Sequence, residues 1–221
     1  MNIYSRQLAA VAICVMGLSS AVLGAELQDA DMHAHHHMMM QAMSQTKSSF
    51  VEYKVPRIEL VRADGKHVFL DEELNDGRPV VMNFIYTTCT SVCPLTSRTF
   101  EELQDKLGTG VDRVHMVSVS IDPEQDTPEV LAQYARKYGA KPQWQFYTGT
   151  MEASIAAQRA FDVYRGSKMN HSPVTLIRTA PGNRWLRIEG FAKPDELLHD
   201  LGNIAASAEA LLPAVAGNEA R

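Results

Sequence analysis

The chain of 221 residues has no excess of positive charge, since 21 Lys and Arg stand against 26 Asp and Glu, for a formal net charge of −5. Binding to a nucleic-acid backbone or an anionic membrane surface depends on clustered cations. The composition therefore gives no support to either partner. With 45% hydrophobic and 21% charged residues, it suits a globular protein with one domain and a sizeable core.

Cysteine is also scarce, with three in the chain. Cys14 lies in an apolar N-terminal stretch, so removal of that stretch would leave Cys89 and Cys93 alone. A disulfide between these two would close so short a loop that it stabilises the fold by only about 2 kcal/mol on the chain-closure model. A domain of this size does not need such a staple. We therefore interpret the two thiols as serving chemistry rather than stability.

Charge is almost absent from residues 1–25, where Arg6 is the only charged residue. The apolar and small stretch that ends at Ala25 is typical of a secretory signal peptide. We predict export to the periplasm or the outer face of the inner membrane, with cleavage near Ala21 or Ala25. About 18 apolar residues also suffice to span a bilayer, so a retained N-terminal anchor is the alternative. Export would place the cysteines in an oxidising compartment.

Residues 26–50 lack the alternation of a strand, and we predict a flexible arm. Nine of the thirteen residues from Asp31 to Met43 are His or Met, and Ser44 to Ser49 reads as a polar linker. Imidazole nitrogen binds Cu(II) and thioether sulfur prefers Cu(I), so the tract favours copper capture. A biased tail without a function is the alternative. The residues expected to capture metal are His33, His35, His36, His37, Met38, Met39 and Met40.

Residues 51–208 alternate strand and helix patterns and are expected to form one domain, and residues 209–221 read as a frayed tail. Strands are expected at Val55–Leu60, His67–Leu70, Pro79–Tyr86, Val114–Ile121, Trp144–Tyr147, Val174–Ile177 and Trp185–Ile188. Helices are expected from Pro94 to Gly108, from Thr127 to Gly139, over Met151–Tyr164 and around Leu197 to Ile204.

The expected order is a β-hairpin, then β-α-β-α-β-α, then a second hairpin and a helix. Alternation at this spacing produces right-handed crossovers and a mainly parallel sheet with helices on both faces. The prediction is thus an α/β fold. The cysteines follow the first crossover strand at its carboxyl end, where open α/β sheets place their functional sites.

The motif from Cys89 to Pro94 (CTSVCP) places two thiols four residues apart where a strand turns into a helix. Pro94 suits the first helical turn, so Cys93 is expected at or near the N-cap. Unpaired backbone N–H groups and the helix dipole favour a thiolate there, and we predict that Cys93 ionises readily. Such a pair can cycle between dithiol and disulfide or hold a soft metal such as Cu(I). The spacing does not choose between these two roles.

His171 lies in the loop just before the strand that begins at Val174. In a thioredoxin-like arrangement this loop packs over the dithiol and often carries a cis-proline. We expect Pro173 to be that residue and to point His171 toward the two sulfurs. Two thiolates and one imidazole make a three-ligand copper site. His67, His115 and His199 are expected to be structural. Asp122, Glu124 and Asp126 are expected to cap or turn the loop after a strand, and the alternative is a rim that contacts a partner or tunes the site.

Three stretches of the chain resemble the Sco/SenC family of copper chaperones for cytochrome c oxidase assembly. They are NFIYTTCTSVCP (Asn83–Pro94), SIDPEQDTPEVL (Ser120–Leu131) and HS followed by an apolar strand (His171–Ile177). Their order and spacing resemble the family across about residues 55–205. The resemblance implies a thioredoxin-like fold, to which this chain adds an N-terminal β-hairpin.

The resemblance also implies copper, as Cu(I) and/or Cu(II), bound by Cys89, Cys93 and His171. It implies a metallochaperone that delivers copper to, or matures, the copper site of a respiratory oxidase. The partner would be a copper-receiving oxidase subunit or another cuproprotein, with a thioredoxin-like reductant as a further partner.

The chain departs from the family pattern in two places: Thr90-Ser91 stand where the family often has Pro-Asp, which loosens the loop and alters its redox poise, and Pro173 follows His-Ser, which favours thiol exchange. The alternative function is therefore a thiol-disulfide oxidoreductase that reduces cysteines of a partner protein. In that case Cys89 and Cys93 are a catalytic, redox-active pair and His171 tunes a thiolate. A thiol peroxidase is disfavoured because the helix-start thiol pairs with a resolving thiol only four residues away.

Overall fold

The computed structural model describes residues 46–211, with side chains over residues 46–203. Its strands are β1 (Lys47–Val51), β2 (Glu59–Arg62), β3 (His67–Phe69), β4 (Val80–Ile85), β5 (His115–Ser120), β6 (Trp144–Thr148), β7 (Val174–Arg178) and β8 (Trp185–Glu189). Its helices are α3 (Leu70–Glu73), α4 (Val92–Leu107), α5 (Pro128–Lys137), α6 (Met151–Ala160) and α7 (Pro194–Leu211), with 3-10 turns η2 (Gly108–Arg113) and η3 (Lys168–Asn170).

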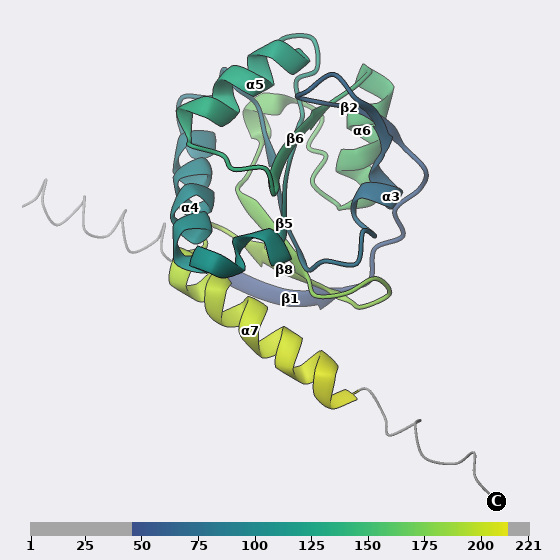
Figure 1. Ribbon diagram of the computed structural model, residues 1–221. Helices are drawn as coiled ribbons and strands as arrows, with labels where there is room; N and C mark the ends of the chain where they lie inside the picture. The colour runs from purple at the N-terminus through teal and green to yellow at the C-terminus, as the bar shows by residue number, and fades with distance from the viewer. Residues whose placement is uncertain (1–45, 212–221) are drawn as a thin grey trace, which may run out of the picture. The chain divides into compact units, whose positions relative to one another are not determined.

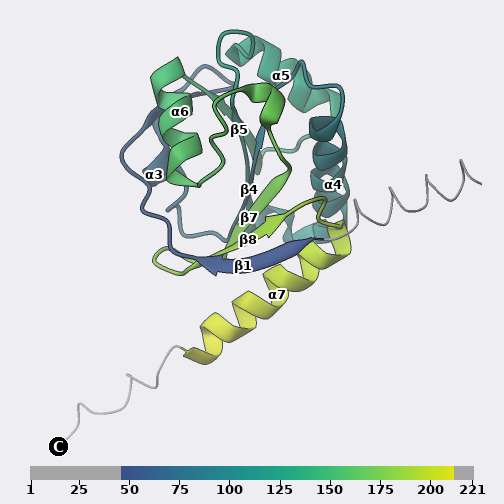
Figure 2. The same ribbon diagram turned by 180° about the vertical axis from the view of Figure 1, so that it is seen from behind.

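The strands form one sheet in the order β1-β8-β7-β4-β5-β6-β2-β3. Helices α4 and α5 lie on one side of it, and α3 and α6 lie on the other (Figures 1 and 2). The α/β architecture with helices on both faces is therefore confirmed, as is the N-terminal hairpin, which is β2–β3. Among the described strands, however, only β4, β5 and β6 run parallel.

The sheet is mixed rather than mainly parallel because both hairpins join it through antiparallel pairs. β2 pairs with β6, and β7 pairs with β4. β1 adds one more antiparallel pair, with β8.

Aromatic side chains fill both interfaces between the sheet and its helices. β4 and β5 are buried at every position, as the apolar run PVVMNFIY predicts for the first of them. Under α4, the ring of Phe100 lies 5.6 Å from that of Trp144. Near the end of α6, Phe161 packs against Phe84 and Trp185. The two packed faces hold the central strands rigidly in place.

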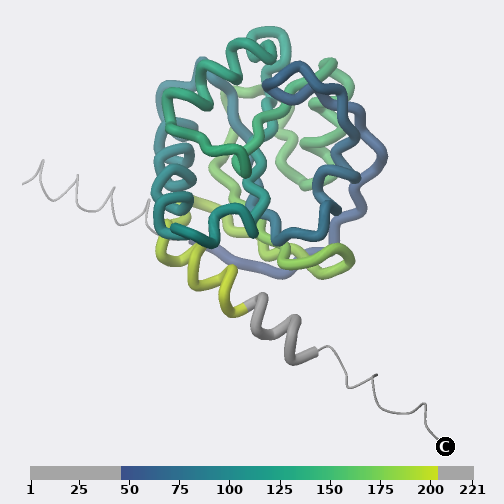
Figure 3. Tube along the Cα trace, viewed as in Figure 1, coloured from purple at the N-terminus to yellow at the C-terminus, as the bar shows by residue number. Residues whose placement is uncertain are grey.

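Strand β1 lies where the sequence predicted an irregular linker, so that prediction is wrong from Lys47 onward. Most of β1 is exposed, and an edge strand of this kind needs no apolar alternation because its partner supplies backbone hydrogen bonds. Lys47 lies opposite Glu189, which lies opposite Val174. β1 therefore begins at the same end of the sheet as the loop of His171. Residues 52–58 then cross to β2, which lies next to β3 at the other edge of the sheet (Figure 3).

Two helix ends differ from the predictions. α6 ends at Ala160 rather than Tyr164, and Asp162 just beyond it takes a left-handed φ of 53°, which helices do not continue through. α7 runs to Leu211, so residues 209–211 are helical rather than frayed. The predicted signal or anchor and the His/Met residues 33–40 lie outside the described part of the chain. Within the described part, no helix is long and apolar enough to cross a membrane.

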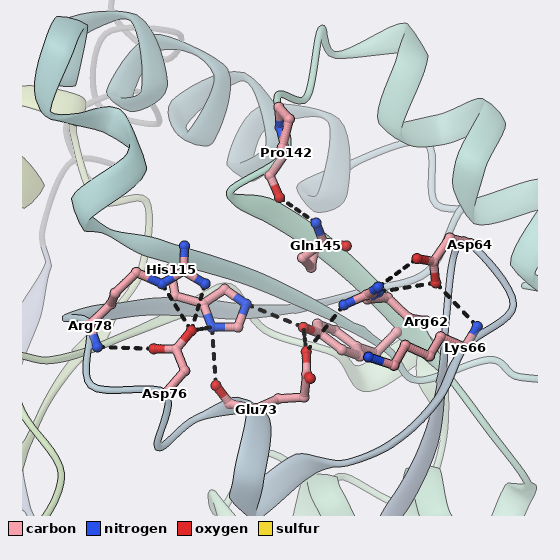
Figure 4. A network of polar contacts seen from close by, with 10 residues as sticks. Arg62, Asp64, Lys66, Glu73, Asp76, Arg78, His115, Pro142 and Gln145 are labelled. Atoms are coloured by element: carbon pink, nitrogen blue, oxygen red, sulfur yellow. Dashed lines mark hydrogen bonds and ion pairs between the residues drawn. The ribbon is translucent and has the colours of Figure 1, made fainter.

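A buried polar network surrounds His115 at the amino ends of β4 and β5 (Figure 4). Its Nδ1 lies 3.1 Å from Asp76 Oδ2, and its Nε2 lies 3.2 Å from the hydroxyl of Tyr147, which donates to Glu73. Burial lowers the pKa of His115, which favours the neutral ring. These contacts agree with the structural role predicted for His115, at the opposite end of the sheet from the cysteines.

Candidate metal and thiol centre

Cys89 and Cys93 lie just beyond the carboxyl end of β4, as predicted. Both are free thiols, 7% and 1% exposed. Cys93 is the second residue of α4, and its backbone N–H donates to the sulfur of Cys89 over 3.4 Å. This hydrogen bond places the Cys89 sulfur at the amino end of α4, where the helix dipole favours negative charge.

The two thiols differ in acidity in the direction opposite to the prediction. Burial raises the pKa of Cys93. Burial also opposes ionisation of Cys89, but hydrogen bonds from the backbone of Cys93 and Ser91 and from the side chains of Cys93 and Tyr86 outweigh it and lower the pKa of Cys89 to about 7. The N-cap is Ser91, so Cys93 sits inside the helix while Cys89 occupies the anion position. The prediction that Cys93 ionises readily is wrong, and the lowered pKa belongs to Cys89.

Buried Asp126 anchors the loop that carries Cys89. Its carboxylate accepts from the backbone N–H of Thr87 over 3.1 Å, from the hydroxyl of Thr87 and from the hydroxyl of Ser120. Asp126 is 0% exposed, and burial raises its pKa. It therefore joins the loop after β5 to the cysteine loop. The sequence left open a capping or turn role and a role in contacting a partner or tuning the site, because nothing local to Asp126 reveals a partner 39 residues away.

His171 lies in the loop before β7, at the same end of the sheet as the cysteines. Its Nε2 is 3.0 Å from the carbonyl oxygen of Phe84 in β4. A carbonyl only accepts, so Nε2 carries the proton and Nδ1 holds the free lone pair. Burial lowers the pKa of His171, which favours the neutral form that ligates metals. The described residues contain no cis peptide bond, so the expected cis-Pro173 is wrong.

Tyr86, which sequence reasoning missed, contacts both parts of the centre. Its carbonyl oxygen accepts from the backbone N–H of Cys89 over 3.2 Å, and its ring meets that of His171 edge-on, with 6.3 Å between centroids. Burial and the Cys89 sulfur raise the pKa of Tyr86 to about 12, so the phenol is a donor at neutral pH. The only signal in the sequence was its place at the end of the apolar run before the motif.

The structure brings the two cysteines together and places His171 at the same end of the sheet, with its ring against that of Tyr86. Among residues 46–203, no three His, Cys, Asp or Glu side chains are grouped so that they could hold a metal ion together. The donors themselves suit a soft metal, because one thiol ionises near neutral pH and a neutral imidazole keeps an open Nδ1.

The loop of His171 is tied to the loop after β5 by an ion pair. Lys168 Nζ lies 2.5 Å from Asp122 Oδ2, and the carboxylate is 6% exposed. The same ammonium lies 5.7 Å from the centroid of the Tyr86 ring. Lys168 therefore links the acidic loop, the tyrosine and the histidine loop.

Comparison with known proteins places these features in one family. The family model SCO1/SenC matches residues 33–206. A SCO1 protein homolog from Bacillus subtilis is 33% identical over 106 residues, which cover 48% of this chain and 54% of that protein. The chain thus spans about half the length of this curated relative.

Two solved structures share the fold. One, described as showing a disulfide switch in BsSco, a member of the Sco family of cytochrome c oxidase assembly proteins, has a TM-score of 0.59 and 24% identity over 72% of this chain and 96% of that one. The other is ScoI of Bradyrhizobium japonicum with copper bound, with a TM-score of 0.56 and 24% identity over 67% of this chain and 98% of that one. The likeness confirms the thioredoxin-like fold predicted from the sequence.

Proposed function

The chain belongs to the SCO1/SenC family, and on that premise we propose that it is a copper-binding assembly factor that delivers copper to, or matures, the copper site of a respiratory oxidase. The observation that carries the proposal is the pair of free cysteines at the start of α4, one of them with a pKa of about 7. Solved relatives of the fold that are described with copper bound support the choice of metal.

Copper is the cargo, and we assign its ligands to Cys89, Cys93 and His171. Cys89 offers a thiolate near neutral pH and would bind first. Cys93 has a raised pKa, so its ligation must release a proton, and copper affinity should rise with pH. His171 would contribute Nδ1, because its Nε2–H already donates to Phe84. Three protein ligands leave room for a ligand from the receiving protein.

Export and copper collection by the His/Met arm complete the proposal. Residues 1–25 carry the signal or anchor pattern, and residues 33–40 carry soft and imidazole donors. The partner would be the oxidase subunit that receives copper. Deletion of residues 31–43 from the exported protein should lower copper occupancy in cells grown with scarce copper, and equal occupancy would remove the arm from the proposal.

An anaerobic Cu(I) titration against a coloured chelator tests the assignment of the centre. The reduced protein without residues 1–45 should take up one tight equivalent, which Cys89→Ser and Cys93→Ser should each abolish. Serine keeps the size and removes the soft donor, so loss of binding reports ligation. Absence of a tight equivalent in the unsubstituted protein would reject the copper centre.

The alternative is a thiol-disulfide oxidoreductase, and the low pKa of Cys89 beside a buried second thiol also suits that chemistry. Turnover of insulin or of an oxidised partner peptide separates the two functions. We expect no turnover at catalytic rates, and rapid turnover without tight copper binding would select the oxidoreductase.

A further inference from the structure

We propose that Lys168 and Asp122 are a positioning pair that ties the loop of His171 to the network anchoring the cysteine loop and thereby raises the copper affinity of the centre, an inference that rests on the proposed function. Neither side chain is assigned as a ligand. The pair, with Lys168 Nζ 2.5 Å from Asp122 Oδ2, acts through the backbones of the two loops that it joins.

On the histidine side, Lys168 belongs to a short hydrogen-bonded turn that ends at His171. The backbone N–H of His171 donates to the carbonyl of Lys168 over 3.1 Å, and that of Asn170 donates to the carbonyl of Ser167 over 3.0 Å. The side chain of Asn170 also donates to the carbonyl of Arg165 over 3.4 Å. Because these bonds close the turn on itself, a constraint on the side chain of Lys168 also restricts the backbone of His171.

On the cysteine side, Asp122 belongs to the network that anchors the loop of Cys89. Its backbone N–H donates to the hydroxyl of Ser120 over 3.0 Å, and its carbonyl accepts from the backbone N–H of Asp126 over 2.9 Å. Asp126 in turn accepts from the backbone N–H of Thr87 over 3.1 Å. An unbroken series of contacts therefore leads from the histidine loop through the ion pair to the cysteine loop.

Apart from Lys168, the turn before the histidine is open to solvent. From Arg165 to Asn170 every residue except Lys168 is exposed, and Met169 is 78% exposed. A cavity of about 230 Å³ lies beside the pair, lined by Lys168 and Asp122 together with residues of α6. The carboxylate of Asp122 is only 6% exposed. Separation of the pair would leave this buried charge without its partner, which is costly, so the pair is a strong tie for a turn with little packing of its own.

The pair affects copper binding through conformational entropy. A loop that is already ordered loses less freedom when its side chain binds a ligand. Without the pair, the turn before His171 must be ordered at the moment of ligation, so the affinity for copper should fall. The loss should be smaller than that caused by His171→Ala, because the imidazole remains and its Nε2–H still donates to Phe84.

Competition for Cu(I) with a coloured chelator tests the proposal on the reduced full-length protein. Lys168→Ala and Asp122→Ala should each weaken binding by about three- to tenfold, less than the roughly 10- to 100-fold typical of groups that contact a ligand directly. Lys168→Arg keeps the cation and should restore most of the affinity. Lys141→Ala is the matched control, because it also removes a lysine paired with an aspartate, over 3.4 Å, but at the amino end of β6, opposite to the centre. It should leave the affinity unchanged.

Two further readouts separate positioning from a general loss of stability. In a His171→Ala background, Lys168→Ala should no longer weaken copper binding, since the pair acts through the histidine. In protein without added copper, the backbone amides of Asn170 and His171 should exchange hydrogen faster in Lys168→Ala. Alkylation of Cys89 should stay unchanged in the same variant.

Unchanged affinity in Lys168→Ala, beside tight copper in the unsubstituted protein, would overturn the role of the pair and leave the proposed function standing. An equal loss in the His171→Ala background would also overturn it. Lack of tight copper in the unsubstituted protein would defeat the proposed function and this inference together. Circular dichroism and thermal unfolding establish that each variant is folded. If Asp122→Ala fails to fold, Asp122→Asn removes the charge, keeps the shape and takes its place with the same expected loss.

Discussion

Alkylation of the two thiols by iodoacetamide across pH offers the sharpest test of the centre. The pKa of about 7 for Cys89 leaves half of it ionised at pH 7, whereas a thiol with a pKa of about 8.5 is only about 3% ionised. At pH 7 the ionised fraction of Cys89 is therefore about fifteen times that of an ordinary thiol. A lower pKa also weakens the nucleophile, with a Brønsted slope of about 0.4–0.5, which removes about fivefold. Cys89 should therefore react about three times faster than an ordinary cysteine of equal exposure.

Cys93 should stay unlabelled while Cys89 reacts, because its pKa is raised and its side chain is buried. The assay is mass spectrometry of digested samples from pH 5 to 10, with Cys89→Ser and Cys93→Ser as matched controls. The rate should have its midpoint near pH 7 in Cys93→Ser and should fall to background in Cys89→Ser. Faster labelling of Cys93, or a midpoint above pH 8.5, would refute the claim that the amino end of α4 stabilises the thiolate of Cys89.

Three other variants test separate contacts. His171→Ala should weaken Cu(I) binding by about 10- to 100-fold in a chelator competition and leave Cys89 alkylation unchanged; equal affinity would remove His171 from the centre. Asp126→Ala should lower the free energy of unfolding in urea by about 3 kcal/mol, because two donors of half-buried Thr87 and one of buried Ser120 lose their acceptor; a change below about 1 kcal/mol would contradict the anchoring role. The lowered pKa of His115 means that the unfolded chain binds more protons than the folded one below about pH 6.5. Stability should therefore fall as pH drops through this range, and His115→Gln should flatten the loss, whereas an equal slope in both proteins would contradict it.

Patterns local in the chain predicted much of the fold. A continuous apolar run marked β4, and Thr127 with Pro128 marked the start of α5, where the Thr127 hydroxyl accepts from the backbone of Val130. The turn at Asp64-Gly65 marked the first hairpin. These features depend on neighbours within a few residues, so the sequence carries them directly.

Features that depend on distant partners were missed. β1 is a strand because β8 offers a free edge, and its own residues show no strand pattern. The acidity of the two cysteines was reversed because burial, which depends on the packed fold, opposes the thiolate of Cys93 more than the helix start favours it. The sequence placed both cysteines and His171 at one end of the sheet, but the contacts of Tyr86 with Cys89 and His171 are visible only in three dimensions.

The register of β1 places its residues at calculable distances from the end of β4. Lys47 lies at the cysteine end of the sheet, and three strand spacings of about 4.8 Å put it about 14 Å from the end of β4. Val51 lies at the other end of the same strand, a further 14 Å or so along its axis. A dye on Lys47 would thus sense Cu(II) bound at the proposed centre without touching it, and the same dye on Val51 would supply the distant reference.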